Sequence, residues 1–119
     1  IALRPDDAML GGLWEFPGGK KETSESIEET VERELNEELG VTVEVGEKFM
    51  DLKHAYSHFK ITLHAYWCTI SDGVPKPKSS NEIRWVSLEE IDEYPFPKAN
   101  KVLINKLLEL PDRDSNGTL

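Results

Sequence analysis

The spacing of apolar residues predicts one amphipathic helix in the first half of the chain. Residues four apart fall on one side of a helix, and here they are Ile27, Val31, Leu35 and Leu39. Ser26 and Glu29 have the Ser-x-x-Glu spacing of a capping box, and Gly40 is placed to close the far end. The pattern therefore predicts a helix between Ser26 and Gly40 with one buried stripe.

Strand patterns lie on both sides of this helix. From Val41 onward the apolar period changes to two, most clearly between Phe59 and Trp67, which predicts a long half-buried strand. Shorter strands are expected at residues 1–4, 13–17 and 82–87. Within the last of these, Trp85 follows the strand pattern and is expected to pack inside.

The carboxyl-terminal part contains a second helix and a polar tail. The closing helix is expected to pack through four apolar residues, Val102, Leu103, Leu107 and Leu110. Pro111 stops it, and residues 112–119 have nothing to bury, so a flexible tail should follow a domain of residues 1–111. Strands around one helix, followed by another helix, favour an α+β fold, arranged as an α/β/α sandwich.

Composition narrows the classes of protein that the chain can belong to. Its 119 residues suffice for one domain, and its net charge of -9 works against binding to nucleic-acid phosphates. A single cysteine, Cys68, excludes an internal disulfide and fits a reducing compartment, so a cytoplasmic location is expected. No apolar run approaches membrane-spanning length, and no membrane contact is expected. Because Ile1 falls inside an apolar run, we interpret the chain as a fragment of a longer protein.

The first predicted helix is unusually rich in glutamate. Glu34, Glu37 and Glu38 share one arc of the helix, and its sequence holds almost nothing that neutralises them. One interpretation is a solvated face. The other is a site for a hard divalent cation, Mg²⁺ or Mn²⁺, because clustered oxygen ligands suit such an ion and substrate phosphates complete its shell. Arg33 could fold back along the helix to reach Glu25.

These residues match a known motif. The chain agrees with every defined position of the Nudix box, which here consists of Gly19, Glu25 after five residues, and residues 33–41 after seven more. The chain therefore resembles the Nudix family. The resemblance implies an α/β/α sandwich with a mixed sheet, and a loop–helix–loop that holds Mg²⁺ or Mn²⁺ against a nucleoside diphosphate linkage.

The same resemblance implies roles for individual residues. The implied metal ligands are Gly18, through its carbonyl, Glu34, Glu37 and Glu38, with Glu82 as a candidate from outside the box. One of Glu37 and Glu38 would also help to activate water, while Arg33 and Glu25 would orient the others.

Two stretches narrow the resemblance within the family. The segment GLWEFPGGK followed by FPKANKVLINKL is similar to MutT-type hydrolases of 8-oxo-dGTP, and Asn100 falls where these use an asparagine to read the oxidised base. An amide both donates and accepts, which suits the N7–H and O8 of 8-oxoguanine. The alternative is that Asn100 only caps or flanks the last helix.

The segment HAYSHFKITLHAYWC, with LGGLWEFPGG, resembles instead the C-terminal domain of MutY-type adenine DNA glycosylases. There Tyr56, Ser57 and His58 would contact 8-oxoguanine, although Tyr56 and His58 could also face solvent. A missing basic amino-terminal domain with an iron–sulfur cluster would supply the DNA contacts. We interpret the chain first as such a lesion-recognition domain. The alternatives are a MutT-type hydrolase, a Nudix hydrolase of another nucleotide, and a binding module with a relic box.

Overall fold

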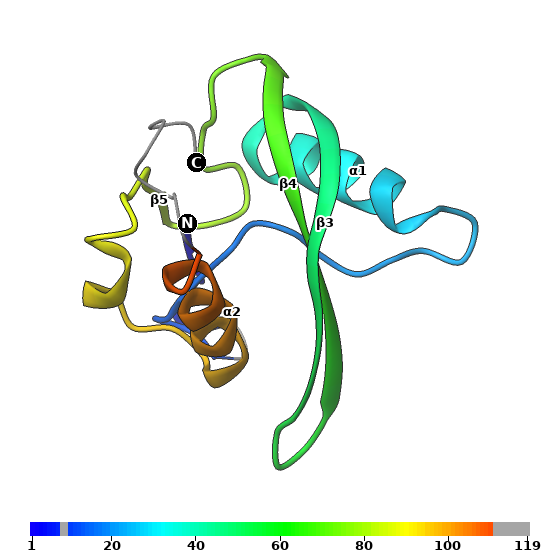
Figure 1. Cartoon of the computed structure of the whole chain (residues 1–119). Coiled ribbons are helices and arrows are strands. Elements are labelled where there is room, and N and C mark those ends of the chain that lie inside the picture. The colour runs from blue at the N-terminus through cyan, green and yellow to red at the C-terminus, as the bar shows by residue number, and fades with distance from the viewer. Residues whose placement is uncertain (8–9, 111–119) are drawn as a thin grey trace.

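A computed structural model of the chain describes residues 1–7 and 10–110 and contains both helices that the sequence predicts (Figure 1). The elements in chain order are β1 (Ala2–Leu3), β2 (Trp14–Glu15), α1 (Ile27–Leu39), β3 (Thr42–Ala55), β4 (Lys60–Asp72), β5 (Glu82–Ile83), the 3₁₀ turn η1 (Ile91–Glu93) and α2 (Lys98–Leu108). The α+β class is thereby confirmed. The expected tail at 112–119 lies outside the described residues. Neither described helix has the length and apolarity that a bilayer-crossing helix requires.

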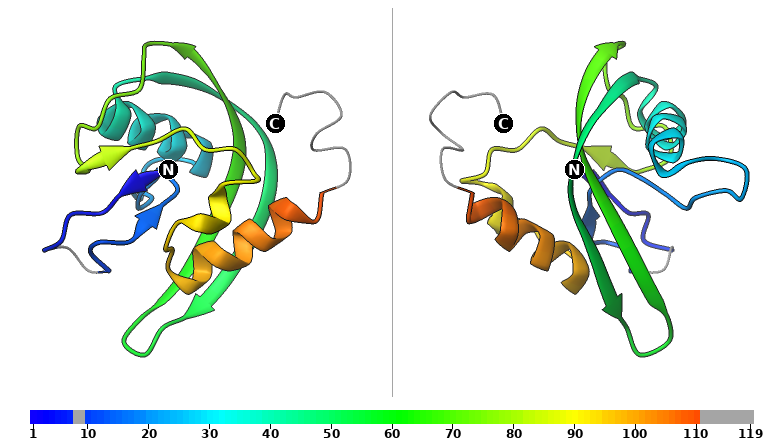
Figure 2. Two further views of the ribbon diagram at one scale, coloured as in Figure 1. Left: turned by 90° about the vertical axis from the view of Figure 1, so that its left-hand side faces the viewer. Right: turned by 45° about the vertical axis from the view of Figure 1, so that its right-hand side comes forward.

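A long hairpin of β3 and β4 forms the centre of the molecule. Its strands run antiparallel from the pair Thr42–Asp72 to the pair Ala55–Lys60, with register shifts after Thr42 and between Val45 and Met50. A second sheet has the order β2-β1-β5, again with antiparallel neighbours. The helices α1 and α2 lie on opposite sides of the hairpin, which gives the expected helix–sheet–helix layering (Figure 2).

The core is divided between the two helices. Under α1 it consists of Leu35, Leu39, Val41 and Val43. Under α2 it consists of Trp14, Ile91, Phe96 and Ile104. The carboxyl-terminal half of the predicted helix stripe is therefore buried, and Val31, which is partly buried, packs against this cluster.

Two packing expectations are wrong. Trp85 is 81% exposed, because β5 ends at Ile83 and the alternation of the sequence does not continue as a strand. Val102 is 36% exposed, whereas Leu103 and Ile104 are buried. Leu103 is thus buried as expected, and Ala99 and Ile104 complete the buried face of α2 in place of Val102.

Both ends of α1 are fixed by local contacts. Ser26 Oγ accepts from the Glu29 N–H at 3.1 Å, and Glu29 Oε1 accepts from the Ser26 N–H at 2.8 Å, which confirms the capping box. Gly40 ends the helix with φ 72°, as predicted. The loop before β5 adds a second cap, since the N–H groups of Lys76 and Lys78 donate to the last carbonyl groups of α1, at 2.9 and 3.0 Å.

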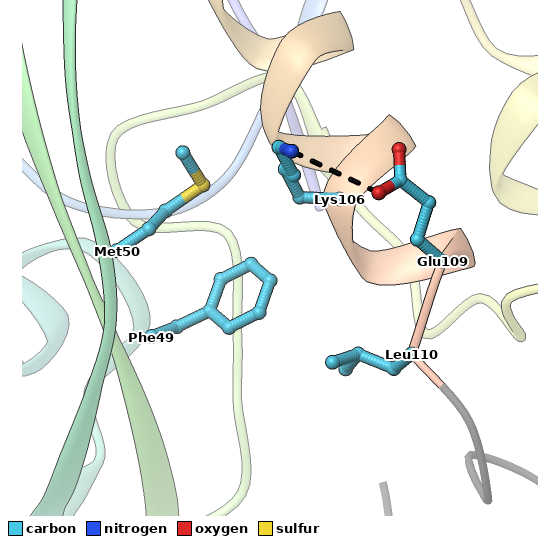
Figure 3. Close-up of a pocket in the computed structure, with 5 residues that line it drawn as sticks. All are labelled: Phe49, Met50, Lys106, Glu109 and Leu110. Atoms are coloured by element: carbon cyan, nitrogen blue, oxygen red, sulfur yellow. Dashed lines mark ion pairs between the residues drawn. The ribbon is translucent and has the colours of Figure 1, made fainter.

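A shallow pocket of about 320 Å³ lies away from α1, between α2 and β3 (Figure 3). Its lining residues are Phe49, Met50, Lys106, Glu109 and Leu110. Lys106 and Glu109 pair across one turn of helix at 3.7 Å. None of the residues of the acidic helix lines this pocket, so it is separate from the candidate site.

Candidate active site

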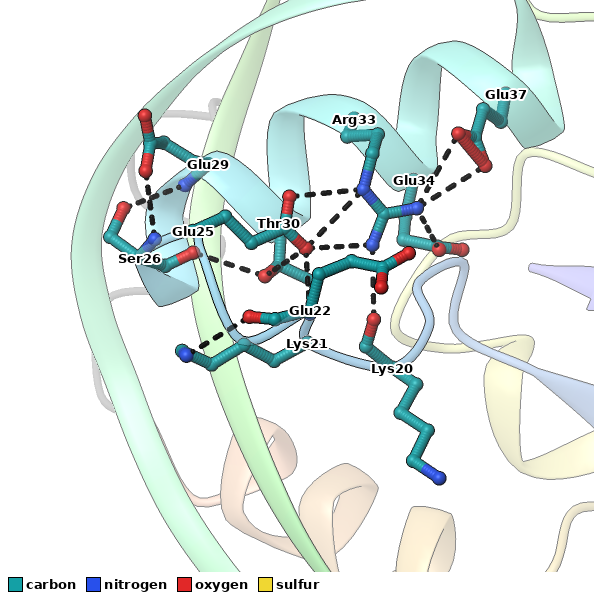
Figure 4. Close-up of polar contacts among 10 residues, drawn as sticks. All are labelled: Lys20, Lys21, Glu22, Glu25, Ser26, Glu29, Thr30, Arg33, Glu34 and Glu37. Atoms are coloured by element: carbon teal, nitrogen blue, oxygen red, sulfur yellow. Dashed lines mark hydrogen bonds and ion pairs between the residues drawn. The ribbon is translucent and has the colours of Figure 1, made fainter.

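The guanidinium group of Arg33 contacts three acidic side chains in and beside α1, those of Glu25, Glu34 and Glu37 (Figure 4). Arg33 Nη2 donates to Glu25 Oε1 at 2.7 Å, and Nε donates to Glu25 Oε2 at 3.0 Å. Arg33 Nη1 donates to Glu34 Oε1 at 2.6 Å and to Glu37 Oε1 at 3.3 Å. Nη2 also donates to the Lys20 carbonyl at 3.0 Å, which ties the preceding loop to the helix. The predicted reach of Arg33 to Glu25 is confirmed. The expectation that Glu34, Glu37 and Glu38 lack a countercharge is wrong for Glu34 and Glu37.

This ion pair is permanent at ordinary pH. The Arg33 hydrogen bonds, followed by the backbone N–H of Glu22 and the hydroxyl of Thr30, lower the pKa of Glu25 to about 2. The carboxylates in turn raise the pKa of Arg33 above its usual value. Neither group exchanges a proton near neutral pH, so the geometry favours orienting roles for Arg33 and Glu25 over proton transfer.

Glu38 lies in a different electrostatic environment. Its Oε2 accepts from the Gly18 N–H at 3.2 Å. Burial, and then the hydrogen-bonded carboxylate of Glu34, raise the pKa of Glu38 to about 8. Glu15 on β2 adds further repulsion, although Arg4 Nη1 binds Glu15 Oε1 at 2.8 Å. In the absence of a cation, Glu38 therefore keeps its proton to a much higher pH than an ordinary glutamate does.

The two glycines ahead of α1 bring the backbone against these carboxylates. A Cβ built at Gly19 would overlap the carboxylate of Glu34, a side chain that is only 16% exposed. Gly18 has φ 155°, which residues with a Cβ rarely adopt, and open space lies beside it. Glycine at both positions therefore lets the loop pass directly over the acidic pair.

The chemistry of this pair fits a hard divalent cation. Carboxylate and carbonyl oxygens are the ligands that Mg²⁺ and Mn²⁺ prefer, and a carboxyl group with a raised pKa, such as that of Glu38, can exchange its proton for a metal ion. Among residues 1–7 and 10–110, no three His, Cys, Asp or Glu side chains are already grouped to hold a metal. The third expected ligand, Glu37, is directed toward Arg33 and is 58% exposed. Binding through all three glutamates would require the Glu37 side chain to turn toward Glu34 and Glu38.

The raised pKa of Glu38 predicts how the metal-free protein responds to pH. Glutamate titrates at about 4.5 in the unfolded chain, and the pKa of Glu38 is about 8 in the folded one. Between these two pH values the folded state binds the Glu38 proton more tightly than the unfolded state does. The contribution of Glu38 to the free energy of unfolding is therefore greatest below pH 4.5 and falls as the pH rises toward 8. We expect the melting temperature in EDTA to fall from pH 5 to pH 9 more steeply for the wild type than for Glu38→Gln. Parallel profiles for the two proteins would show that Glu38 is not the titrating group.

Among the residues predicted to contact the base, the structure brings Tyr56 and Asn100 together. Tyr56 lies between β3 and β4, and its hydroxyl oxygen accepts from the Ala99 N–H at 3.1 Å. Asn100 is the next residue of α2. Ser57 and His58 occupy the turn of the hairpin and are exposed. A common site for all four would need a ligand that reaches from the start of α2 to the turn.

Asn100 does not cap its helix. The N-cap is Pro97, and Asn100 Oδ1 instead accepts from the Phe16 N–H at 3.4 Å, which links α2 to the segment after β2. Glu82, the candidate ligand from outside the box, is paired with Arg84, whose Nε donates to its Oε2 at 2.5 Å. In the part of the chain that the structure describes, Glu82 joins no group of three possible metal ligands.

Sequence reasoning missed Glu15 and Arg4. Glu15 is the one charged residue in the apolar stretch LWEFP, which directly precedes the two glycines. This position could have indicated that Glu15 lies near the acids of α1. Arg4 gave no signal, because its pairing with Glu15 depends on the antiparallel contact between β1 and β2. Together they place an ion pair beside the carboxylates of α1.

Comparison with known proteins identifies the motif. A family profile described as the NUDIX domain matches residues 1–106. The chain is 36% identical over 110 residues to the CTP pyrophosphohydrolase of Escherichia coli K12, which covers 92% of this chain and 82% of that protein. It is also 36% identical over 110 residues to the 8-oxo-dGTP diphosphatase of the same organism, covering 92% and 85%.

Solved structures agree with these relatives. The E. coli ORF135 protein superposes with a TM-score of 0.77 at 33% identity, over 99% of this chain and 83% of that one. The MutT protein of Methanosarcina mazei Go1 gives a TM-score of 0.80 at 25% identity, over 97% and 83%. These proteins favour the MutT-type hydrolase over the domain of an adenine DNA glycosylase. They give no support to the glycosylase interpretation, nor to the DNA partner and iron–sulfur domain that it implied. The chain has the Nudix fold and belongs to the Nudix family of hydrolases.

Proposed function

We propose that the chain is a MutT-type, Mg²⁺- or Mn²⁺-dependent hydrolase that cleaves a nucleoside triphosphate, foremost 8-oxo-dGTP, to the monophosphate and pyrophosphate. The observation that carries this proposal is the Glu34–Glu38 pair beneath the Gly18–Gly19 turn, with Arg33 on its flank. Relatives named for 8-oxo-dGTP and for CTP are equally similar to the chain, so its base preference depends on residues outside the box.

The residues of α1 would divide the work between metal binding and orientation. Glu34, Glu37, Glu38 and the Gly18 carbonyl would hold the cation, which when bound neutralises phosphate charge and polarises the phosphoryl group toward water. Arg33 keeps Glu34 in place through a 2.6 Å contact, and Glu25 keeps Arg33 in place in turn. Glu82 would contribute only if it left Arg84.

The proton of the attacking water needs an acceptor close to the phosphate. Glu38 is suited to this role by its position, because the Gly18 N–H holds its carboxylate beneath the Gly18–Gly19 turn. Glu37 is the alternative acceptor, since it lies on the same arc of α1.

A direct test is pyrophosphate release from a panel of nucleotides. We expect turnover of 8-oxo-dGTP with Mg²⁺ or Mn²⁺, faster than that of dGTP and CTP, and none with EDTA. Faster turnover of CTP would retain the hydrolase and reject the oxidised base as its substrate. Turnover in EDTA at the same rate would reject the metal site.

Asn100 provides a separate test of base recognition. We expect Asn100→Ala to reduce the preference for 8-oxo-dGTP over dGTP, measured as the ratio of kcat/KM values, by about tenfold, because one base-reading amide is lost. Asn105→Ala is a matched control, since Asn105 is an exposed residue of the same helix. An unchanged ratio for Asn100→Ala would remove this residue from base recognition.

A further inference from the structure

We propose that Tyr56 is a positioning residue, which holds the first turn of α2 against the hairpin and so fixes the amide of Asn100. The inference rests on the proposed role of Asn100 in reading the base. It differs from the expectation that Tyr56 itself meets the base, because its hydroxyl group is already engaged with the protein backbone.

The start of α2 lacks a cap of its own. The first N–H groups of a helix have no partner within it, and the N-cap residue Pro97 makes no side-chain hydrogen bond. Ala99 is fully buried, so its N–H cannot be satisfied by water. The hydroxyl oxygen of Tyr56 accepts this hydrogen bond at 3.1 Å and so caps the helix from another element.

Tyr56 is itself held firmly in the turn. Its ring stacks on Phe59 with centroids 4.8 Å apart, and His54 approaches edge-on at 4.6 Å. Its N–H donates to the Phe59 carbonyl at 2.7 Å, which closes the turn between β3 and β4. The turn lies at the end of the hairpin that is farthest from α1, on the side of the molecule where α2 begins (Figure 2). Tyr56 therefore transmits the position of the turn to α2.

Asn100 is held from two directions as a result. Its backbone follows Ala99 directly, and its Oδ1 accepts from the Phe16 N–H at 3.4 Å. Phe16 is in turn stacked on Phe96, with centroids 5.9 Å apart. Loss of the Tyr56 hydroxyl would leave the Ala99 N–H without its partner and loosen the turn of helix that carries Asn100.

Tyr56→Phe tests this proposal, because it removes the hydroxyl group and keeps the aromatic ring. We expect the ratio of kcat/KM for 8-oxo-dGTP over dGTP to fall about three- to tenfold through KM, with kcat unchanged within about twofold. Tyr66→Phe is the control, since it removes the same hydroxyl group from a tyrosine on β4 of the same hairpin. Amide hydrogen exchange at Ala99 should accelerate in Tyr56→Phe alone.

The double variant with Asn100→Ala separates positioning from direct contact. If Tyr56 acts through Asn100, Tyr56→Phe will not lower the ratio further when Asn100 is absent. An equal further loss would show that Tyr56 contacts the base itself, and would overturn the proposal. A loss with Asn100→Ala but none with Tyr56→Phe would also overturn it while leaving the proposed function intact. If neither variant changes the ratio, both assignments fail.

Discussion

Replacement of Glu38 by glutamine is expected to lower kcat by about 10³-fold, because the variant loses a metal-binding oxygen and the proposed proton acceptor together. The loss will not come from unfolding. Glu38 and Glu34 repel each other in the metal-free protein, so removal of one charge should leave the melting temperature in EDTA at pH 8 equal or higher.

The matched control for this variant is Glu32→Gln, a change of the same kind at an exposed position of α1. Its kcat should stay within about twofold of the wild type, since surface changes away from a site have small effects. If Glu38→Gln kept kcat within tenfold of the wild type, Glu38 would have no part in the reaction.

The second large effect is expected from Gly19→Ala. The new methyl group would overlap the carboxylate of Glu34, which is the end of a flexible side chain and can move aside. The fold should therefore survive, while Glu34 leaves both Arg33 and Glu38. We expect turnover to fall about 10²-fold, as displacement of a reacting group by about 1 Å can do.

Gly46→Ala serves as the control for the glycine change itself. It lies in β3, where a Cβ would approach the Trp67 carbonyl oxygen at 3.2 Å, and none of the acids of α1 is affected. Circular dichroism should show folded protein for both variants. If the folded Gly19→Ala variant turned over substrate as fast as the wild type, the reaction would not require Glu34 in its present position.

Local patterns in the sequence were sufficient to predict α1 and its ends. The Ser26–Glu29 capping box, the Gly40 cap and the reach of Arg33 to Glu25 all join residues within about two turns of helix. Such contacts are local in the sequence, so the helix and the residues just before it are enough to predict them. The same geometry placed three glutamates on one arc but could not show that Arg33 pairs with Glu34 and Glu37 and leaves Glu38 unpaired by it.

Features that depend on contacts between distant segments were not predictable. The ion pair of Arg4 with Glu15 requires the pairing of β1 with β2, and the Tyr56–Ala99 contact joins residues 43 apart. Trp85 looked like a core residue because it continues an apolar alternation, yet the strand ends at Ile83. Alternation predicts burial only where a partner strand is present.

The central claim is that Glu34, Glu37 and Glu38 bind a divalent cation when a nucleotide is present. Mn²⁺ broadens the NMR signals of nearby nuclei, so titration of ¹⁵N-labelled protein with Mn²⁺ and a non-hydrolysable nucleoside triphosphate tests this claim directly. We predict that the amide signals of Gly18, Gly19 and residues 34–38 broaden first, at the lowest Mn²⁺ concentration. Broadening that begins elsewhere on the acidic surface, while these signals remain sharp, would contradict it.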